Sequence, residues 1–506
     1  MTVTRDVDAD FLALPLRAVA DAALSAARTA GAQHADVRVH RVLTQSIRLR
    51  DGVVQAVSDG DEIGVAVRVI VDGTWGFASH AEVSPDVAAA LARQAVEVAK
   101  ALRSLNRDPV TLADEPVYAD ATWVSPYLED PFTTPTADKV ALLVDYSGRL
   151  QAGDGVDHVT ASVLQVKEQT FYADLAGSSI TQQRVRLHPE FEATAVDKSA
   201  GSFESMRTLA PPVGRGWEYL GAESTWNWGE ELAQIPEWLA EKTKAPTVEA
   251  GPTDLVIDPT NLWLTIHESI GHATEYDRAI GYEAAYAGTS FATPDQLGTL
   301  KYGTPLMHVT ADRNEEHGLA SVGFDDDGVA SQRWDLVADG TLVGYQLDRV
   351  FAPRLGLTRS NGCSYADSAH HVPIQRMANV SLSPDPSTDT STEDLISRVE
   401  NGIYVVGDKS WSIDMQRYNF QFTGQRFFKI RDGKLDGQVR DVAYQATTTD
   451  FWGSMEAVGG ESTWRLQGAF NCGKAQPGQV AAVSHGCPSA MFRGVNILNT
   501  RSEAQQ

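Results

Sequence analysis

The sequence predicts an α+β protein, with helix–sheet–helix layers at the N-terminus followed by a mainly antiparallel, twisted β domain. Two observations lead to this prediction. In the first half of the chain, Ala-rich segments flank stretches in which polar and apolar residues alternate. After residue 253 the chain breaks into many short strand-like stretches separated by Asp-Gly pairs. Helices that precede and follow strands in this order cover one sheet, which is typical of α+β folds.

The first predicted domain comprises residues 1–105. Residues 16–31 and 84–103 are amphipathic and Ala-rich, so each is expected to form a helix. Residues 35–80 alternate with a period of two, as strands do. The expected hairpin turns between these strands are Asp51-Gly52 and Asp72-Gly73.

A similar order of elements recurs in a second predicted α+β domain, residues 136–250. Residues 106–135 contain five prolines and are predicted to be a linker between the two domains. The second domain is expected to have a helix over 136–151, strands across 157–197 and a Trp-rich helix near 226–243.

The third predicted domain, residues 251–506, is β-rich and carries a single conspicuous helix that bears the candidate metal site. Its strands are separated by Asp327-Gly328, Asp339-Gly340 and Asp432-Gly433. Ser391 and Asp394 have the spacing of a capping box and predict a short helix through Val399.

Composition excludes several classes of function. The net charge of −25 over 506 residues argues against nucleic acid as a partner, because phosphate binding requires basic patches. The stretch Met1–Asp10 is acidic and lacks the apolar core of a secretion signal, and no apolar run approaches the length of a membrane span. Three cysteines are too few for a disulfide framework. These features favour a cytoplasmic protein with no membrane partner.

The most informative motif is His267-Glu268-Ser269-Ile270-Gly271-His272. Neutral imidazoles are good zinc ligands, and an adjacent glutamate is suited to take a proton from metal-activated water. Five residues separate the histidines by about 140° on a regular α-helix, too far to share one ion. We therefore predict a widened or broken helix at Ser269–Gly271, with Gly271 giving the backbone freedom for the distortion.

Two histidines leave a catalytic zinc one protein ligand short. Cys472, followed by Gly473, is the first choice, and Cys487, Cys363 and Glu275 are the alternatives. Composition alone does not rank them, because a free cysteine is most often a small buried apolar residue.

Four further residues are candidates for supporting roles. Glu275 and Asp277 either orient the imidazole rings or are solvated acids at a helix end. Tyr276 and His485 are candidates for stabilising an oxyanion.

Several further motifs occur in an order that resembles the TldD/PmbA family of metallopeptidases. The resemblance covers roughly residues 255–480. It is carried by the His267–His272 helix, Gly323–Gly328, Leu342–Arg349, Gln375–Asn379, Gly402–Val405 and Asn471–Lys474. The family has a TldD-like branch with the metal helix and a sister branch, TldE or PmbA, without it; this chain resembles the TldD branch. It departs from the family pattern at Ser484–Ser489, where a Gly- and Val-rich strand is usual.

The resemblance implies zinc held by His267, His272 and Cys472, with Glu268 as the catalytic base. It also implies a heterodimer with a TldE/PmbA-like sister subunit that degrades unfolded peptides and can process leader peptides of modified peptide toxins. Two alternatives differ in kind. One is an assembly or regulatory subunit, paired with a sister chain or with itself, whose structural metal is closed by Cys472 and Cys487 together. The other is a metal-dependent amidase acting on small molecules.

Overall fold

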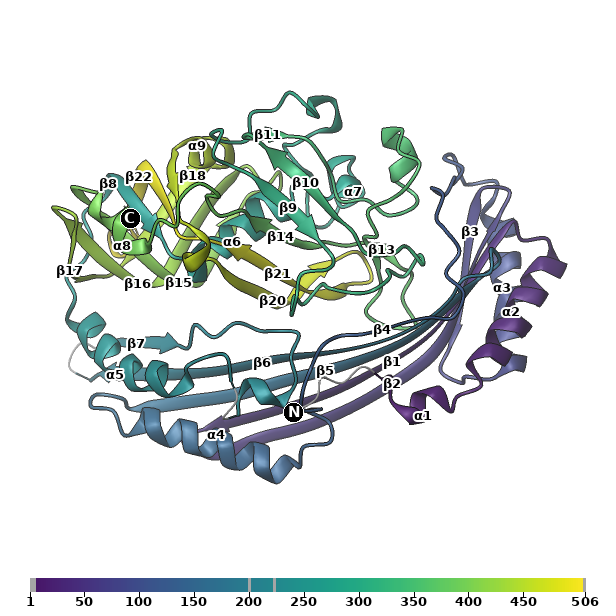
Figure 1. Ribbon diagram of the computed structural model, residues 1–506, viewed down its shortest axis with the longest axis horizontal. Helices are drawn as coiled ribbons and strands as arrows, with labels where there is room; N and C mark the ends of the chain where they lie inside the picture. Colours follow the sequence, from purple (N-terminus) through teal and green to yellow (C-terminus); the bar gives the residue numbers. More distant parts are fainter. Residues whose placement is uncertain (1–5, 199–201, 222–223, 504–506) are drawn as a thin grey trace.

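The computed structural model describes residues 6–198, 202–221 and 224–503. The first half of the chain builds one long curved sheet, and the C-terminal part lies over its concave face (Figure 1). This arrangement of helices with mainly antiparallel sheets confirms the α+β prediction. The start of the acidic stretch Met1–Asp10 lies outside the described residues.

The long sheet has the strand order β3-β2-β1-β5-β6-β4, and β7 pairs with the far end of β6. Its strands are β1 (His34–Arg50), β2 (Val53–Val71), β3 (Thr74–His80), β4 (Ala121–Val124), β5 (His158–Asp174), β6 (Ser179–Asp197) and β7 (Ser202–Arg207). β1 pairs with β2 on one side and with β5 on the other, over most of its length. Residues 1–105 and 136–250 therefore share one sheet, to which residues 106–135 add β4. The division into separate domains stays a prediction.

Four long helices cover the two ends of the convex side of this sheet, as predicted (Figure 1). Helices α2 (Leu16–Ala30) and α3 (Pro85–Leu102) pack on β1–β3, and α4 (Thr136–Gln151) and α5 (Trp228–Lys244) pack on β5–β7. A short helix, α1 (Ala9–Leu12), precedes α2. Each fully buried Val or Leu at these contacts contributes roughly 1.5–3 kcal/mol.

The opposite face of the sheet is polar, and it too is buried where the C-terminal part of the chain covers it. Val67 and Val69 face the helices, whereas Arg68 between them points toward the C-terminal part of the chain. Its guanidinium contacts Asp36 at 3.0 Å and Asp327 at 2.7 Å. The two halves of the molecule are thus joined by ion pairs rather than by a continuous apolar core.

The C-terminal part is organised around a ring of strands. β15 pairs with both β8 and β16, so β8, β15, β16, β18 and β22 close on themselves. Only the β8–β15 pair is parallel; the other pairs in the ring are antiparallel. The strands of this sheet are β8 (Gly251–Ile257), β15 (Asn401–Ile413), β16 (Asn419–Arg431), β17 (Lys434–Val439), β18 (Val442–Thr447), β19 (Met455–Val458) and β22 (Ala490–Asn499).

Smaller sheets connect the ring to the candidate metal helix. They consist of β9 (Val309–Asp312), β10 (Arg333–Ala338), β11 (Thr341–Leu342) and β14 (Asn379–Leu382); β12 (Ser364–Tyr365) with β13 (Ile374–Gln375); and β20 (Arg465–Lys474) with β21 (Gln479–Cys487). The predicted turns Asp339-Gly340 and Asp432-Gly433 join β10 to β11 and β16 to β17. Asp327-Gly328 instead lies in a loop closed by a bridge between Phe324 and Ala330.

The remaining helices are short. They are α6 (Pro259–Ile266), α7 (Tyr276–Ala279), α8 (Thr392–Ser397), α9 (Thr448–Gly453) and α10 (Thr500–Glu503). Ser391 and Asp394 form the predicted capping box at the start of α8. Among the described residues, every helix is too short or too polar to cross a lipid bilayer.

Candidate metal centre

The candidate metal helix begins at α6 and changes pitch where the sequence predicts it. Asp258 caps α6 by accepting a hydrogen bond from Thr260 N at 3.0 Å. Residues His267–Gly271 then form a π-helical turn, and His272 N donates to His267 O at 3.0 Å. The extra residue in this turn brings the two imidazoles onto one face, with ring centroids 4.6 Å apart. The predicted distortion of the helix is confirmed.

Gly271 has a different role from the one expected. Its φ is not in the left-handed region, so the π turn does not depend on the conformational freedom of glycine. The residue is instead closely packed: a Cβ added there would lie 2.6 Å from Sδ of buried Met377 and 3.6 Å from Cε1 of His485. A side chain at this position would therefore displace residues behind the candidate site.

Cys472 reaches the histidines from β20, 200 residues after His272 in the chain. Among the strands that the structure describes, β20 pairs with β21 alone, and its register shifts between Ala469 and Cys472. Such a bulge bends a strand and redirects the side chain that follows it. Arg376 holds the local backbone by donating to Cys472 O and, at 3.1 Å, to Gln479 O.

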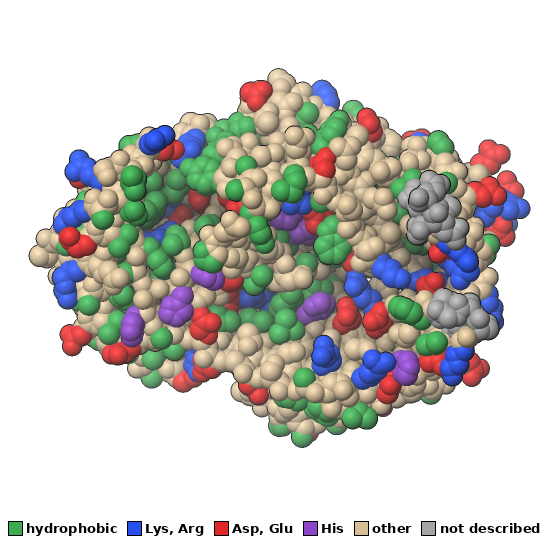
Figure 2. Space-filling view, turned by 180° about the vertical axis from the view of Figure 1, so that it is seen from behind, with side chains coloured by type: hydrophobic (Ala, Val, Ile, Leu, Met, Phe, Trp, Pro, Cys, Tyr) green, Lys and Arg blue, Asp and Glu red, His purple; other side chains and the backbone are tan. Residues whose placement is uncertain are grey.

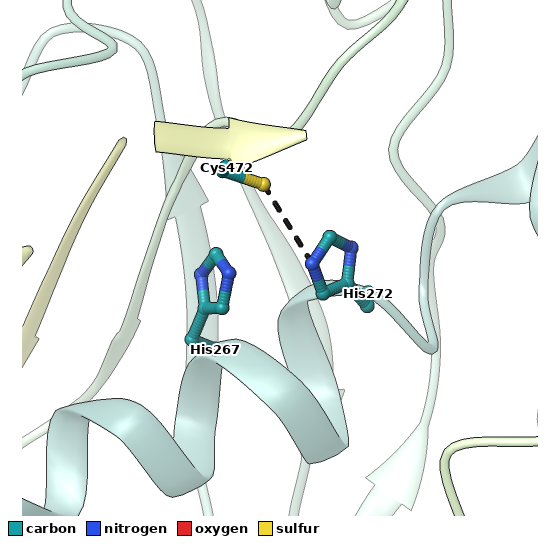
Figure 3. Close-up of side chains that lie close together, drawn as sticks. All are labelled: His267, His272 and Cys472. Carbon is teal, nitrogen blue, oxygen red and sulfur yellow. Dashed lines mark hydrogen bonds between the residues drawn. The ribbon is translucent and has the colours of Figure 1, made fainter. Parts of the chain in front are cut away.

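The structure brings His267, His272 and Cys472 together, with one donor atom of each within 4.8 Å of the others (Figure 3). Cys472 Sγ lies 3.6 Å from His272 Nε2. Tetrahedral zinc with its usual bond lengths spaces nitrogen and sulfur by about 3.6 Å. Two nitrogens and one sulfur are also the donor types that zinc prefers, so the residues fit a zinc ion.

The protonation states suit metal binding. Burial lowers the pKa of both His267 and His272, which keeps the imidazoles neutral. Burial alone would raise the pKa of the Cys472 thiol, but nearby His272 and Arg376 outweigh it and lower the pKa below its ordinary value. A neutral imidazole pair beside a thiol that ionises readily is a suitable ligand set.

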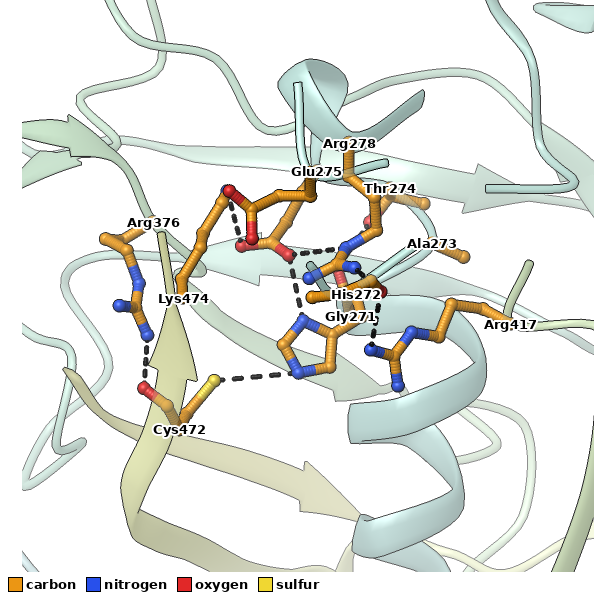
Figure 4. Close-up of polar contacts among 12 residues, drawn as sticks. Gly271, His272, Ala273, Thr274, Glu275, Arg278, Arg376, Arg417, Cys472 and Lys474 are labelled. Atoms are coloured by element: carbon orange, nitrogen blue, oxygen red, sulfur yellow. Dashed lines mark hydrogen bonds and ion pairs between the residues drawn. The ribbon is translucent and has the colours of Figure 1, made fainter. Parts of the chain in front are cut away.

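An ionised network supports His272 from behind (Figure 4). His272 Nδ1 lies 2.8 Å from Glu275 Oε2, and Glu275 in turn accepts from Arg278 Nε at 3.2 Å and Lys474 Nζ at 3.1 Å. Lys474 also donates to Asp277 at 2.8 Å. Burial opposes ionisation of Glu275, but Lys474, His272 and Arg278 together hold its pKa well below the ordinary value. Its carboxylate therefore accepts the Nδ1 proton and leaves Nε2 of His272 free for a metal.

A neutral relay supports His267. His267 Nδ1 lies 2.7 Å from Nε2 of His485, which is on β21. His485 Nδ1 lies 2.8 Å from Val380 O. Because a carbonyl only accepts, His485 Nδ1 carries the proton and Nε2 accepts from His267. Nε2 of His267 therefore carries no proton and is free to bind a metal. Trp263 stacks on His485 with an interplanar angle of 15°.

The other sequence candidates lie elsewhere. Cys487 is buried and its Sγ faces Pro259 O at 3.6 Å, and Cys363 is buried in the main core. Glu275 contacts the far nitrogen of His272 rather than the donor cluster. Tyr276 packs against Tyr345 and Phe351, away from an oxyanion position. Of the alternatives for the third donor, Cys472 alone joins the two histidines in the part of the chain that the structure describes.

Glu268 lies at the same site and is paired with a residue that sequence reasoning missed. Arg417 Nη1 donates to Glu268 Oε2 at 2.6 Å, and Arg417 Nη2 donates to Ala287 O at 3.3 Å. Arg417 sits in the hairpin between β15 and β16, with a φ of 63°. Nothing in its local sequence marks it, because the pairing with Glu268 spans 149 residues.

The donors and Glu268 open into a cavity of about 540 Å³ between the two halves of the molecule. One wall is formed by β6 around His188–Glu190 and by residues 207–212; the other is formed by α6 and by residues 467–473 of β20. In Figure 2, acidic, basic and histidine side chains are mixed on the face seen from behind, and a hollow separates the two halves. The site is thus a buried donor set at the wall of an open cleft.

Two models of one family match the chain. The PmbA/TldA metallopeptidase C-terminal domain matches residues 250–499, and PmbA/TldA metallopeptidase domain 1 matches residues 35–99. The first match contains both histidines, Glu268 and Cys472.

Proteins of known name resemble the chain over nearly its whole length. A metalloprotease of Methanothermobacter thermautotrophicus is 29% identical, over 98% of this chain and 100% of the relative. A zinc metalloprotease TldD homolog of Saccharolobus solfataricus is 21% identical, over 92% of this chain and 97% of its own length. The crystal structure of TldE from Thermococcus kodakarensis has the same fold, with a TM-score of 0.68 at 15% identity over 94% of this chain and 98% of that one.

Proposed function

The chain belongs to the PmbA/TldD family of metallopeptidases, and from this premise we propose that it is a zinc-dependent peptidase of the TldD type that hydrolyses unfolded peptides. One observation carries the proposal. His267, His272 and Cys472 form a three-donor set at the wall of an open cavity, with Glu268 beside it. Three protein ligands with an open fourth position are typical of catalytic rather than structural zinc.

A bound zinc ion would supply Lewis acidity, which activates water and polarises a peptide carbonyl. Glu268 is the proposed base: it takes the proton of the attacking water and passes it to the leaving amine. Arg417 fixes Oε2 of Glu268 at 2.6 Å, while Oε1 has no protein hydrogen-bond partner among the described residues. That free oxygen is the atom we assign to proton transfer.

The substrate is proposed to bind as an added strand along β20. One edge of β20 pairs with β21, and residues 467–473 line the cavity without a second strand partner in the described part of the chain. An extended peptide would satisfy the free backbone groups with little demand on its side chains. Such binding accepts many unfolded sequences and rejects folded ones.

Two alternatives receive less support. A structural metal would need a fourth side-chain donor, and Cys487, the candidate for that role, lies against Pro259 instead. A small-molecule amidase would be expected to enclose its substrate. The cavity of about 540 Å³ instead lies open between two halves of the molecule and runs beside a strand edge.

Partner and location follow from the family membership and remain proposals. We propose a cytoplasmic complex with a TldE-like sister subunit, supported by the shared fold with TldE from Thermococcus kodakarensis. Self-pairing is the alternative. Leader peptides of modified peptide toxins are one proposed substrate class.

The central experiment measures zinc content and cleavage of an unfolded peptide for wild type, Glu268→Gln, Cys472→Ser and Cys487→Ser, with and without a sister subunit. Glu268→Gln should retain zinc and lose about 10²–10⁴-fold in kcat, because it removes the general base. Cys487→Ser, the matched control for a buried cysteine, should keep both zinc and activity, whereas Cys472→Ser should lose zinc. Full activity of Glu268→Gln with zinc bound would refute the assignment of the base.

A further inference from the structure

A second cavity of about 150 Å³ lies beside the proposed peptide cleft. It is lined by Arg184 and Arg186 of β6 and by residues 313–322. Neighbouring residues of the same segments line the two cavities. On β6, Arg186 lines the second cavity and His188 the first; after β7, Gly214 lines the second cavity and Pro212 the first. Two residues of an extended strand span about 7 Å. An extended chain in the cleft therefore needs only a few residues to reach the second cavity.

Side chains that line the two cavities lie close to one another. The guanidinium of Arg186 lies 5.9 Å from the ring of Phe470, which stacks on His188 at 5.6 Å. Phe470 and His188 both line the larger cavity. The arginine cluster is thus at one end of the same cleft and not on a separate surface.

Two of the guanidinium groups that line the second cavity share one carboxylate. Arg184 and Arg186 both donate to a single oxygen, Oε2 of Glu168. The other oxygen of Glu168 accepts from the hydroxyl of Tyr365 at 2.6 Å. One carboxylate therefore serves two buried guanidinium groups.

Arg313 adds a third guanidinium and has no partner of its own. The residue is only 3% exposed, its Nε has no hydrogen-bond partner, and its guanidinium forms no ion pair with any residue that the structure describes. It lines the second cavity and, with Arg184, the narrow crevice next to it. A buried charge without a partner is strongly unfavourable, so such groups normally meet a counter-ion or a ligand.

The nearest acidic groups are already engaged. Asp325 accepts three backbone N–H groups, those of Asp327, Val329 and Ser364, and Asp326 is paired with Arg38. Burial lowers the pKa of Arg313, and the charge of Arg184 adds to this, while Cys363, Asp325 and Asp326 offset only part of the effect without bonding to the guanidinium. Glu315 and Glu316 line the cavity too, but neither lies within ion-pair distance of Arg313.

We propose that this cavity is a carboxylate-binding subsite for the peptide substrate, with Arg313 as the principal contact and Arg186 beside it. The guanidinium fork matches a carboxylate in two parallel hydrogen bonds. The carboxylate comes either from the C-terminus of the peptide or from an Asp or Glu side chain a few residues from the cleaved bond. This inference rests on the proposed function, because it assigns part of the specificity of the same cleft.

Binding is measured by titration calorimetry on zinc-loaded Glu268→Gln protein, which binds peptide without turning it over. The probes are one unfolded hexapeptide with a free C-terminal carboxylate, its C-terminal amide, and versions in which an internal Glu is changed to Gln. A charge-assisted hydrogen bond predicts about 10–100-fold weaker binding when the relevant carboxylate is neutralised. The amide identifies a C-terminal source, and the Gln versions identify a side-chain source.

Arg313→Met, made in the same background, should abolish this preference and leave binding of the neutral peptide unchanged. Arg333→Met, which removes an exposed arginine outside the cavity, is the control and should keep the preference. If Arg313→Met does not fold, the comparison of acid and neutral peptides on the parent protein still decides the question. Equal binding of all probes would overturn the subsite. Wild-type protein that cleaves none of the peptides while still preferring the carboxylate would instead overturn the proposed function alone.

Discussion

The two candidate histidine ligands are supported by different chemistry on their far sides. His272 is held by the carboxylate of Glu275, which is anchored by Lys474 and Arg278. His267 is held by a neutral imidazole, His485, whose own proton goes to a backbone carbonyl. We refer to these as the ionic support and the neutral support.

The two supports have one effect in common and one that differs. Both supports fix the same tautomer and leave Nε2 free. An ionised partner also makes the imidazole more basic and therefore a stronger metal ligand. The ionic support has a cost, because each buried charge needs a counter-charge. We therefore expect stability to depend mainly on the ionic support, and both supports to contribute to metal affinity.

The largest effect is expected from breaking the ionic support at Lys474. Lys474→Met removes the charge that holds Glu275 and Asp277 and keeps a chain of similar length. Leaving buried carboxylates without this partner should lower the free energy of unfolding by about 3–5 kcal/mol. Urea denaturation of the zinc-free protein measures the change.

Lys100→Met provides the control for this prediction, because Lys100 forms an exposed pair with Glu97. Its removal should change stability by no more than about 0.5 kcal/mol. Equal effects of the two substitutions would mean that the ionic support carries no special stability.

The second largest effect is expected in the pH dependence of stability, through the buried acid Asp348, whose charge interacts with that of Asp277. Burial and the charges of Asp327 and Asp277 raise the pKa of Asp348 from 3.8 to about 7. Between about pH 4 and pH 7 the unfolded chain has lost this proton while the folded protein keeps it, so stability falls as pH rises through this range. Asp348→Asn removes the titration and can still accept from Val350 N and Phe351 N.

The advantage of Asp348→Asn over wild type should therefore grow from near zero at pH 4 to about 2–4 kcal/mol above pH 7. Urea denaturation at four pH values across this window tests it. A constant difference between the two proteins at all pH values would contradict the raised pKa.

The smallest effect compares the two supports directly through zinc affinity. Glu275→Gln keeps a hydrogen-bond acceptor near His272 but removes the charge, and we expect zinc to bind about 100-fold more weakly. His485→Phe removes the neutral acceptor behind His267 while retaining a ring for Trp263 to stack on, and about 10-fold weaker binding is expected. Competition with a chelator of known affinity measures both. A larger loss for His485→Phe would reverse the comparison.

Local features of the site could be predicted from the sequence. A spacing of five positions from His267 to His272 is incompatible with shared coordination on a regular helix, so the spacing alone required the π turn that the structure contains. Asp-Gly pairs likewise identified hairpin turns such as Asp339-Gly340. These features depend on neighbouring residues and on backbone geometry.

Features that depend on distant pairing could not be predicted. The sequence did not single out the third donor, because the position of that residue depends on the register of β20 with β21 and on a bulge near Ala469. Arg417, His485 and Arg313 acquire their positions only when strands from different parts of the chain meet. Alternation in the first half predicted strands, yet it did not indicate that β1 would pair with both β2 and β5.

The unpaired edge of β20 has one more consequence. A strand edge exposed on an outer surface invites pairing with another molecule and leads toward aggregation. Here the edge faces a cleft whose opposite wall is β6, so a sheet of a second copy meets a steric barrier before it can align. The placement of this edge inside a cleft therefore limits pairing to chains narrow enough to enter it.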